Sequence, residues 1–126
     1  MQYTAFSKDT LVFRGYEDDH FIINAERYTQ NLLLIDNQVH QPWGQKSVAE
    51  LTEQDFCFLD QQQPEILLIG TGDCTRFPSP AIMQLFDQRR IPFECMNSAA
   101  AARTFNLLLA EDRRVAAAMY LPGIKA

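Results

Sequence analysis

The sequence is poor in the residues from which disulfide-bonded, metal-binding and hydrolytic sites are built. It has three cysteines, Cys57, Cys74 and Cys95, and no CxxC pair. An odd number of widely spaced cysteines argues against the disulfide framework of a small secreted protein. The two histidines, His20 and His40, have no metal-ligand spacing around them, and no GxSxG motif is present. We therefore predict no metal site, no cofactor and no hydrolase triad.

Long apolar runs and a basic leader are also missing. No apolar stretch approaches the roughly 20 residues that a membrane-spanning helix needs. The N-terminus, MQYTAFSKDT, lacks both the basic stretch and apolar run of a signal peptide and the arginines of a transit peptide. We expect no membrane insertion and a cytoplasmic location.

Positive charge is in short supply, because 11 Lys and Arg face 16 Asp and Glu, for a net charge of −5. An acidic surface repels the phosphates of nucleic acids and of anionic membranes, so no nucleic acid partner is predicted. Apolar residues make up 47% of the 126 residues, enough to offset chain entropy. This length and composition predict one folded domain over residues 1–126.

The first part of the chain, residues 1–43, reads as short β-strands separated by turns. Apolar runs predict strands at 11–13, 21–23, 32–35 and 38–40. Gly15 is expected to stop the first strand, and Asp36-Asn37 is a plausible tight turn between the last two. These strands predict a β-meander or a small second sheet. Trp43, which follows Pro42, is interpreted as a core or hairpin-end anchor more readily than as a binding platform.

The second part alternates helix and strand. A capping-box pattern at either Ser47 or Thr52 predicts a helix that runs to about Leu59. Beyond it the pattern predicts strands at 66–69, 93–96 and 115–121, a helix at 80–90 that starts after Ser79, and a helix at about 99–111. This alternation indicates an α/β fold: layered, with a central mixed, partly parallel sheet and helix crossovers.

One candidate site follows from this topology, because ligands of open α/β sheets favour the carboxyl ends of the strands. Gly70, Thr71 and Gly72 follow one predicted strand, whereas Asn97 and Ser98 follow the next and open a helix. Glycines let backbone amides approach a ligand, and a helix N-terminus offers unpaired N–H donors. The pattern is typical of a small anion site. It lacks the full GxGxxG and a P-loop lysine, so nucleotide binding is not supported.

Three polar residues of the following helix, Arg103, Thr104 and Asn106, are the side chains that would reach such a site. Arg103 would add a forked cationic donor. Structural interpretations stay open beside this one. The glycines can serve only a tight turn, Asn97 and Ser98 can serve only as helix caps, and Arg103 can pair with a carboxylate such as Glu65 or Glu111.

The thiols Cys74 and Cys95 are both expected near the same edge. A redox pair or a thiolate nucleophile there would need a lowered pKa. Two ordinary free thiols is the interpretation we favour.

Several segments, taken in order, resemble the signatures of the Mth-like domain family. Pro64–Gly72 is similar to its "PE-(apolar)-IGTG" segment, and Met96–Asn106 to its Met-x-Thr-x-x-Ala-x-x-Thr-aromatic-Asn pattern. Glu111–Ala118 resembles its Glu-Gly-Arg-x-Val-Ala-Ala-Ala pattern, and Pro42-Trp43 matches a Pro-Trp upstream. The family positions that this resemblance carries over are Gly70, Thr71, Gly72, Arg103, Thr104 and Asn106.

The resemblance implies a layered α/β fold with a central mixed sheet, and no established enzymatic activity or cofactor. Members of the family include a mitochondrial assembly factor for respiratory complex I, the adipogenesis-associated Mth-domain protein and many uncharacterised prokaryotic proteins. The chain departs from the pattern where Ser98 replaces the usual Thr, Ala102 a common Cys, and Asp112 a Gly. The lack of a mitochondrial leader indicates a prokaryotic member.

Two functional hypotheses follow. The first is a non-catalytic interaction or assembly-factor-type module whose partner is another protein. The second is a binder of, or an enzyme for, a small anion or metabolite at the edge formed by Gly70, Thr71 and Gly72, with Arg103 as the cation.

Overall fold

Two β-sheets organise residues 9–126, the range that the computed structural model describes. Residues 1–8, on which the expectation of no signal peptide partly rests, lie outside that range. The smaller sheet has the antiparallel order β1-β2-β3, with β1 at Phe13–Glu17, β2 at His20–Ile23 and β3 at Glu26–Tyr28. The N-terminal region is therefore a small second sheet, one of the two arrangements predicted for it.

The larger sheet has five strands in the order β5-β4-β8-β6-β7. Its strands are β4 (Leu32–Ile35), β5 (Gln38–His40), β6 (Ile66–Gly70), β7 (Phe93–Met96) and β8 (Val115–Met119). β6 runs parallel to β7 and β8, whereas β4 runs antiparallel to β5 and β8. The predicted mixed, partly parallel sheet is confirmed.

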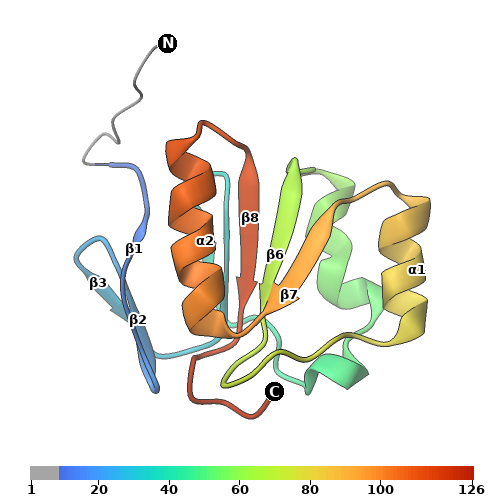
Figure 1. Cartoon of the computed structure of the whole chain (residues 1–126), viewed down its shortest axis with the longest axis horizontal. Coiled ribbons are helices and arrows are strands. Elements are labelled where there is room, and N and C mark those ends of the chain that lie inside the picture. Colours follow the sequence, from blue (N-terminus) through green and yellow to red (C-terminus); the bar gives the residue numbers. More distant parts are fainter. Residues whose placement is uncertain (1–8) are drawn as a thin grey trace.

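Helical segments cover both faces of this sheet. α1 (Pro80–Gln88) connects β6 to β7, and α2 (Ser98–Ala110) connects β7 to β8. Two short 3-10 helices, η1 (Val48–Glu50) and η2 (Glu53–Asp60), lie between β5 and β6. Figure 1 shows α2 next to β8, the green η2 segment behind the sheet, and the small sheet on the other side of α2. The result is a layered α/β fold with helix crossovers, as predicted.

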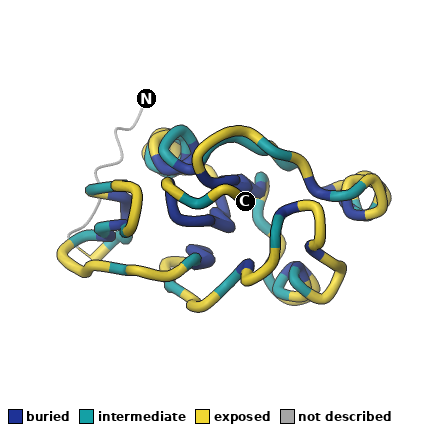
Figure 2. Tube along the Cα trace, turned by 90° about the horizontal axis from the view of Figure 1, so that it is seen from below, coloured by how far each residue is buried: buried dark blue, intermediate teal, exposed yellow. Residues whose placement is uncertain are grey.

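Burial follows from the alternation of side chains along the central strands. Leu67 and Ile69 of β6 join an apolar cluster with η2 and α1, whereas Leu68 joins a second cluster with α2 and the small sheet. β8 is buried along its whole length, and its three alanines, residues 116–118, leave room for apolar layers on both sides. In Figure 2 the buried segments gather centrally while exposed ones form the outer turns.

In the small sheet one predicted strand has different bounds and one strand was not predicted. β1 does not end at Gly15 but starts at Phe13 and continues to Glu17, with a register shift between Phe13 and Gly15. Gly15 lies within the strand and faces Ile22. A β-carbon at Gly15 would lie only 3.1 Å from the Ile22 side chain, so the lack of a side chain allows this close packing. β3 was not predicted, since Glu-Arg-Tyr has no apolar alternation, and it forms because β2 offers an edge to pair with.

The predicted helix from residue 47 or 52 to 59 is also wrong in type, because the segment forms η1 and η2 instead. Ser47 Oγ lies 2.8 Å from the Glu50 carboxylate and caps no backbone amide. The second capping box does form, with the Asp55 carboxylate accepting the Thr52 N–H at 2.8 Å. The helical path is interrupted at Phe56, which has non-helical φ/ψ of −111°/18° and a fully buried side chain.

Helix and strand ends differ slightly from expectation. α1 ends at Gln88, and Arg90 takes a positive φ of 54°. β8 leaves its ladder after Met119, two residues early. No helix within residues 9–126 has the length and apolar character needed to cross a bilayer.

The small sheet is attached to α2 through Asn106. Its Oδ1 accepts the Phe13 N–H at 2.9 Å, and its Nδ2 donates to the Phe13 carbonyl at 2.8 Å. The Phe13 ring meets the rings of Phe105 and Phe21 edge-on, with centroids 5.4 and 5.3 Å away. Asn106 therefore pairs both backbone groups of a buried residue at the start of β1.

We expect Asn106→Ala to lower the free energy of unfolding by about 1–3 kcal/mol, because it leaves the Phe13 N–H and C=O without these partners. Urea denaturation measures the change. Leu107→Ala is the matched control on the same helix; its side chain is exposed, so its effect should stay within about 0.5 kcal/mol. Equal effects of the two substitutions would show that Asn106 does not hold β1.

Candidate functional site

The carboxyl ends of β6 and β7 meet the N-terminus of α2, as the topology predicted. The Thr71 N–H donates to the Met96 carbonyl at 2.8 Å, and the Ser98 N–H donates to the Gly72 carbonyl at 2.9 Å. Asn97 is the N-cap of α2, and its Oδ1 accepts the Ala100 N–H at 2.8 Å. These bonds bring Gly70, Thr71, Gly72, Asn97 and Ser98 together.

Ser98 is a buried connector at this edge and not the helix cap. Its hydroxyl accepts the Gly72 N–H at 2.8 Å and donates to the Tyr120 carbonyl at 2.5 Å. The residue has no exposed surface. One hydroxyl thus joins the loop after β6, the first turn of α2 and the chain leaving β8.

The two glycines make room for other parts of the protein. A β-carbon on Gly70 would lie 2.7 Å from Met119 Sδ and 3.0 Å from Ser98 Oγ. Gly72 has φ +84°, and a β-carbon there would lie 2.1 Å from the Ile124 carbonyl oxygen. The close neighbours of both glycines are therefore side chains and backbone of the chain itself.

Thr71 is likewise fully buried, and its polar atoms contact the loop that follows it. Thr71 Oγ1 lies 2.7 Å from the Cys74 carbonyl and 3.1 Å from the Met96 carbonyl, and it accepts the Arg76 N–H at 3.0 Å. The Asp73 N–H donates to the Ile124 carbonyl at 2.9 Å. The backbone N–H groups of Thr71, Gly72, Asp73 and Arg76 all donate within the protein.

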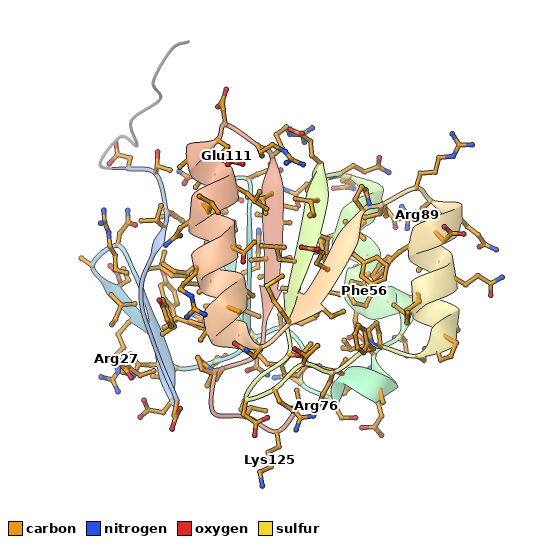
Figure 3. All side chains as sticks on the ribbon, in the orientation of Figure 1. Arg27, Phe56, Arg76, Arg89, Glu111 and Lys125 are labelled. Atoms are coloured by element: carbon orange, nitrogen blue, oxygen red, sulfur yellow. The ribbon has the colours of Figure 1, made fainter. Side chains whose placement is uncertain are left out.

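Arg76 is a feature of this edge that our sequence analysis missed. Its Nη1 donates to Asp73 Oδ1 at 2.7 Å and lies 3.3 Å from the Thr71 carbonyl. The hydrogen bond from Arg76 holds the pKa of the Asp73 carboxyl below its usual value. In Figure 3, Arg76 and Lys125 lie at the same end of the molecule, opposite Arg89 and Glu111. The only available signal was an arginine five residues after Thr71.

The three candidate residues of α2 lie farther along that helix and have separate contacts. The Arg103 guanidinium carbon is 5.7 Å from the centroid of the Tyr16 ring in β1, which is a cation–π distance. Thr104 Oγ1 lies 3.5 Å from Met96 Sδ, and Asn106 holds Phe13. The structure therefore does not bring Arg103 or Asn106 to the glycine loop.

Neither of the two carboxylates suggested as partners for Arg103, Glu65 and Glu111, forms a salt bridge with it among the described residues, and Glu65 is bonded elsewhere. Glu65 lies 3.3 Å from Arg113 Nε and accepts the Arg114 N–H at 3.0 Å. The Arg114 N–H and then Arg113 lower the pKa of this carboxyl. The possible pairing of Arg103 with Glu65 is thus replaced by the Tyr16 contact.

The thiols are separate and unlike one another. Cys57 and Cys74 are exposed, Cys95 is half-buried, and none of the three forms a disulfide. Burial raises the pKa of the Cys95 thiol to about 11, which is the opposite of what a thiolate nucleophile needs. Residues 9–126 contain no group of three or more His, Cys, Asp or Glu side chains placed to hold a metal ion.

Two clefts lie away from this edge. One, of about 380 Å³, is lined by Leu33, Trp43 and Phe58 with His40, Lys46 and Gln62 among its polar residues. The other, of about 330 Å³, lies at the opposite ends of the strands, between Leu34, Phe105 and Arg114. Neither is lined by any of the eight candidate residues.

Fold and site together define a layered α/β domain whose carboxyl edge is closed by internal hydrogen bonds. Residues 13–120 match the family described as "Protein of unknown function (DUF498/DUF598)". The chain belongs to this family.

Two relatives illustrate the family. The chain is 32% identical over 110 residues to the Bos taurus protein named NADH dehydrogenase [ubiquinone] 1 alpha subcomplex assembly factor 3, which covers 86% of this chain and 59% of that protein. It is 29% identical over 106 residues to the Francisella tularensis "13 kDa major membrane protein", covering 83% and 86% of the two chains. The chain thus spans about three fifths of the assembly factor.

Solved structures agree with this placement. An NMR structure of a Xanthomonas campestris protein has a TM-score of 0.80 and 32% identity, covering 93% of this chain and 89% of that one. A Bordetella pertussis protein described as a Mth938-like domain has a TM-score of 0.70 and 24% identity, over 98% and 93% of the chains, and so shares the fold. The resemblance to the Mth-like domain family is confirmed.

We expect Ser98→Ala to lower the free energy of unfolding by about 2–4 kcal/mol, because each buried group left without a partner, the Gly72 N–H and the Tyr120 C=O, costs about 1–3 kcal/mol. Thr104→Ala, which loses only a weak hydroxyl–sulfur contact on the same helix, should change it by about 0.5 kcal/mol or less. Denaturant unfolding of both variants measures this. A tolerated Ser98→Ala would contradict the connector role.

Iodoacetamide at pH 8 should modify Cys57 and Cys74 in the folded protein and spare Cys95, whose thiol is protonated and partly covered. Peptide mass spectrometry reads out each site, with urea-unfolded protein as the control in which all three react. Because the pKa of Cys95 is higher in the folded protein than its usual 9.0, its thiol loses a proton more easily in the unfolded state. The free energy of unfolding should therefore fall as the pH rises from 9.0 toward about 11. Rapid modification of Cys95 in the folded state would contradict this assignment.

Proposed function

We propose that this chain is a non-catalytic module that acts by binding another protein, in the manner of an assembly factor. The observation that supports the proposal most directly is that polar groups at the carboxyl ends of β6 and β7 are hydrogen-bonded within the protein. Thr71 and Ser98 are fully buried, and their hydroxyls bond to backbone groups of the same chain. These buried hydroxyls therefore stabilise the fold of the edge. A module that binds a partner through its surface needs such a stable fold.

The surface supplies apolar side chains for such contacts. Phe77 in the loop before α1 is 59% exposed, and Leu107 at the outer face of α2 is 60% exposed. Exposed large apolar side chains are enriched where proteins meet. The names of the matched mammalian relatives, which refer to an assembly factor for a NADH dehydrogenase, favour the same class of function.

We expect the chain to bind another protein, to bind no nucleic acid and not to insert into a membrane. The net charge of −5 favours this choice, because polyanions are repelled. A cytoplasmic location stays part of the proposal.

A thermal-shift screen separates this function from that of an anion or metabolite binder. We expect phosphate, nucleotides and small carboxylates to leave the melting temperature of the wild-type protein and of Arg103→Ala equally unchanged. A specific ligand at about 100 times its Kd would add roughly 2.7 kcal/mol, a rise of several degrees. A rise that disappears in Arg103→Ala would overturn the proposal and place a ligand near α2.

A further inference from the structure

The second cleft, of about 330 Å³, opens onto the apolar cluster that packs against α2. Its apolar walls come from three parts of the chain: Leu34 of β4, Phe105 and Leu109 of α2, and Val115 at the start of β8. Three of these side chains are buried, and Leu109 is partly buried. Ligand sites range over roughly 300–1,000 Å³, so a cleft of this size suits a small molecule.

The charged residues that line this cleft are Asp36, Asp112, Arg113 and Arg114. Two of them are already bonded to other side chains. Asp36 Oδ2 accepts a hydrogen bond from Gln62 Nε2 at 2.9 Å, and Arg113 Nε lies 3.3 Å from Glu65 Oε2. The charges left for a ligand are therefore one carboxylate and one guanidinium.

Those two charges belong to Asp112 and Arg114, which are both exposed. Among residues 9–126 neither side chain forms a hydrogen bond or an ion pair. Arg114 meets Glu65 through its backbone N–H at 3.0 Å, which leaves its guanidinium without a bonded carboxylate. The cleft thus combines an apolar floor with one negative and one positive group, two residues apart in the chain.

Asp112 stands where local structure disfavours it. It follows Glu111, labelled in Figure 3 at the end of α2, and has φ 62°. The Asp112 N–H donates to the Leu109 carbonyl at 3.0 Å and the Arg113 N–H to the Leu108 carbonyl at 3.1 Å, a Schellman motif in which glycine usually holds this position. The last carbonyls of a helix also repel a carboxylate. A side chain kept against two local preferences, beside a cleft, indicates a functional role.

A ligand with a cationic and an anionic group would satisfy both free charges. An ammonium beside Asp112 would neutralise the carboxylate, and the negative end of the α2 dipole would attract it too. A carboxylate on the same molecule would accept forked hydrogen bonds from the Arg114 guanidinium. An apolar side chain would fill the space beside Phe105 and Leu109. An apolar α-amino acid has these three parts.

We propose that this cleft binds a free α-amino acid with a large apolar side chain, whose ammonium pairs with Asp112 and whose carboxylate pairs with Arg114. This binding activity is additional to the binding of another protein. It uses neither Arg103 nor the residues at the carboxyl ends of β6 and β7. A purely anionic or purely cationic metabolite does not fit, because it would leave one of the two charges unpaired.

The test is a titration of the full chain, followed by ¹H–¹⁵N NMR, with three compounds that share one ring. The probe is L-phenylalanine, while 3-phenylpropanoate lacks its ammonium and 2-phenylethylamine lacks its carboxylate. We expect L-phenylalanine to shift the Leu109 and Val115 amides with a Kd on the order of 1 mM. Each partial compound should bind at least about threefold more weakly, the difference expected for one exposed charge pair.

Two variants each remove one charge and keep the backbone contacts. Asp112→Asn introduces a residue that tolerates a positive φ, and Arg114→Gln retains the N–H that bonds Glu65. Each should weaken L-phenylalanine binding at least about threefold. Asp112→Asn should also melt no lower than the wild type, because the end of α2 loses an unfavourable charge. Arg103→Ala, which removes a cation outside the cleft, should leave the Kd unchanged.

Several results would overturn this assignment. One is equal affinity for the three compounds, and another is the absence of shifts at about 20 mM L-phenylalanine. Shifts centred on the Trp43 indole, or binding that is lost in Arg103→Ala and kept in Arg114→Gln, would place the ligand outside this cleft. A lower melting temperature of Asp112→Asn would show that the carboxylate stabilises the fold and is not held for a ligand.

Discussion

The Ser98 hydroxyl is the contact on which the packing of the domain depends. β6 and β8 are central and parallel, so their carboxyl ends lie side by side and both chains must turn away there. α2 starts at the same place and crosses over both strands. A buried hydroxyl that takes the Gly72 N–H and gives to the Tyr120 carbonyl satisfies two of the backbone groups that these turns expose. Without it, three segments would meet around unpaired polar atoms.

Other features follow from how closely these segments approach. Gly70 has no side chain because Met119 and Ser98 occupy that space, and Gly72 has none because the Ile124 carbonyl does. The position of α2 in turn sets the position of Asn106, which pairs both backbone groups of Phe13 and so attaches the small sheet. The Ser98 hydrogen bonds at the N-terminus of α2 and the Asn106 hydrogen bonds along the helix thus both fix the position of α2.

This arrangement explains how much the sequence could predict. Ile66–Gly70, the Ser79-Pro80 start of α1 and the Asn97 cap are local signals, and the structure bears them out. β3 and the kink at Phe56 depend on distant partners, β2 in one case and the aromatic core in the other, so local pattern did not reveal them. The glycine loop and Ser98 were located correctly, but sequence cannot tell whether their polar atoms face a ligand or each other.

The cleft beside β5 is a second feature that the sequence could not predict. Trp43 was interpreted as a core or hairpin-end anchor, and its ring does pack edge-on against Phe56 and Tyr120. It also lines an open cleft together with Leu33 and Phe58. The cleft is lined by residues that are distant in the sequence, such as Leu33 and Phe58, so no local motif predicts it.

Residue-resolved amide hydrogen exchange tests the central account most directly, because it reports whether the donors at the carboxyl edge are engaged. The account predicts that the Thr71, Gly72 and Asp73 amides exchange as slowly as that of Leu68 in the middle of β6, through opening of the whole domain. Fast exchange of these three amides, beside a protected Leu68, would contradict it, since the loop would then hold free donors for a ligand.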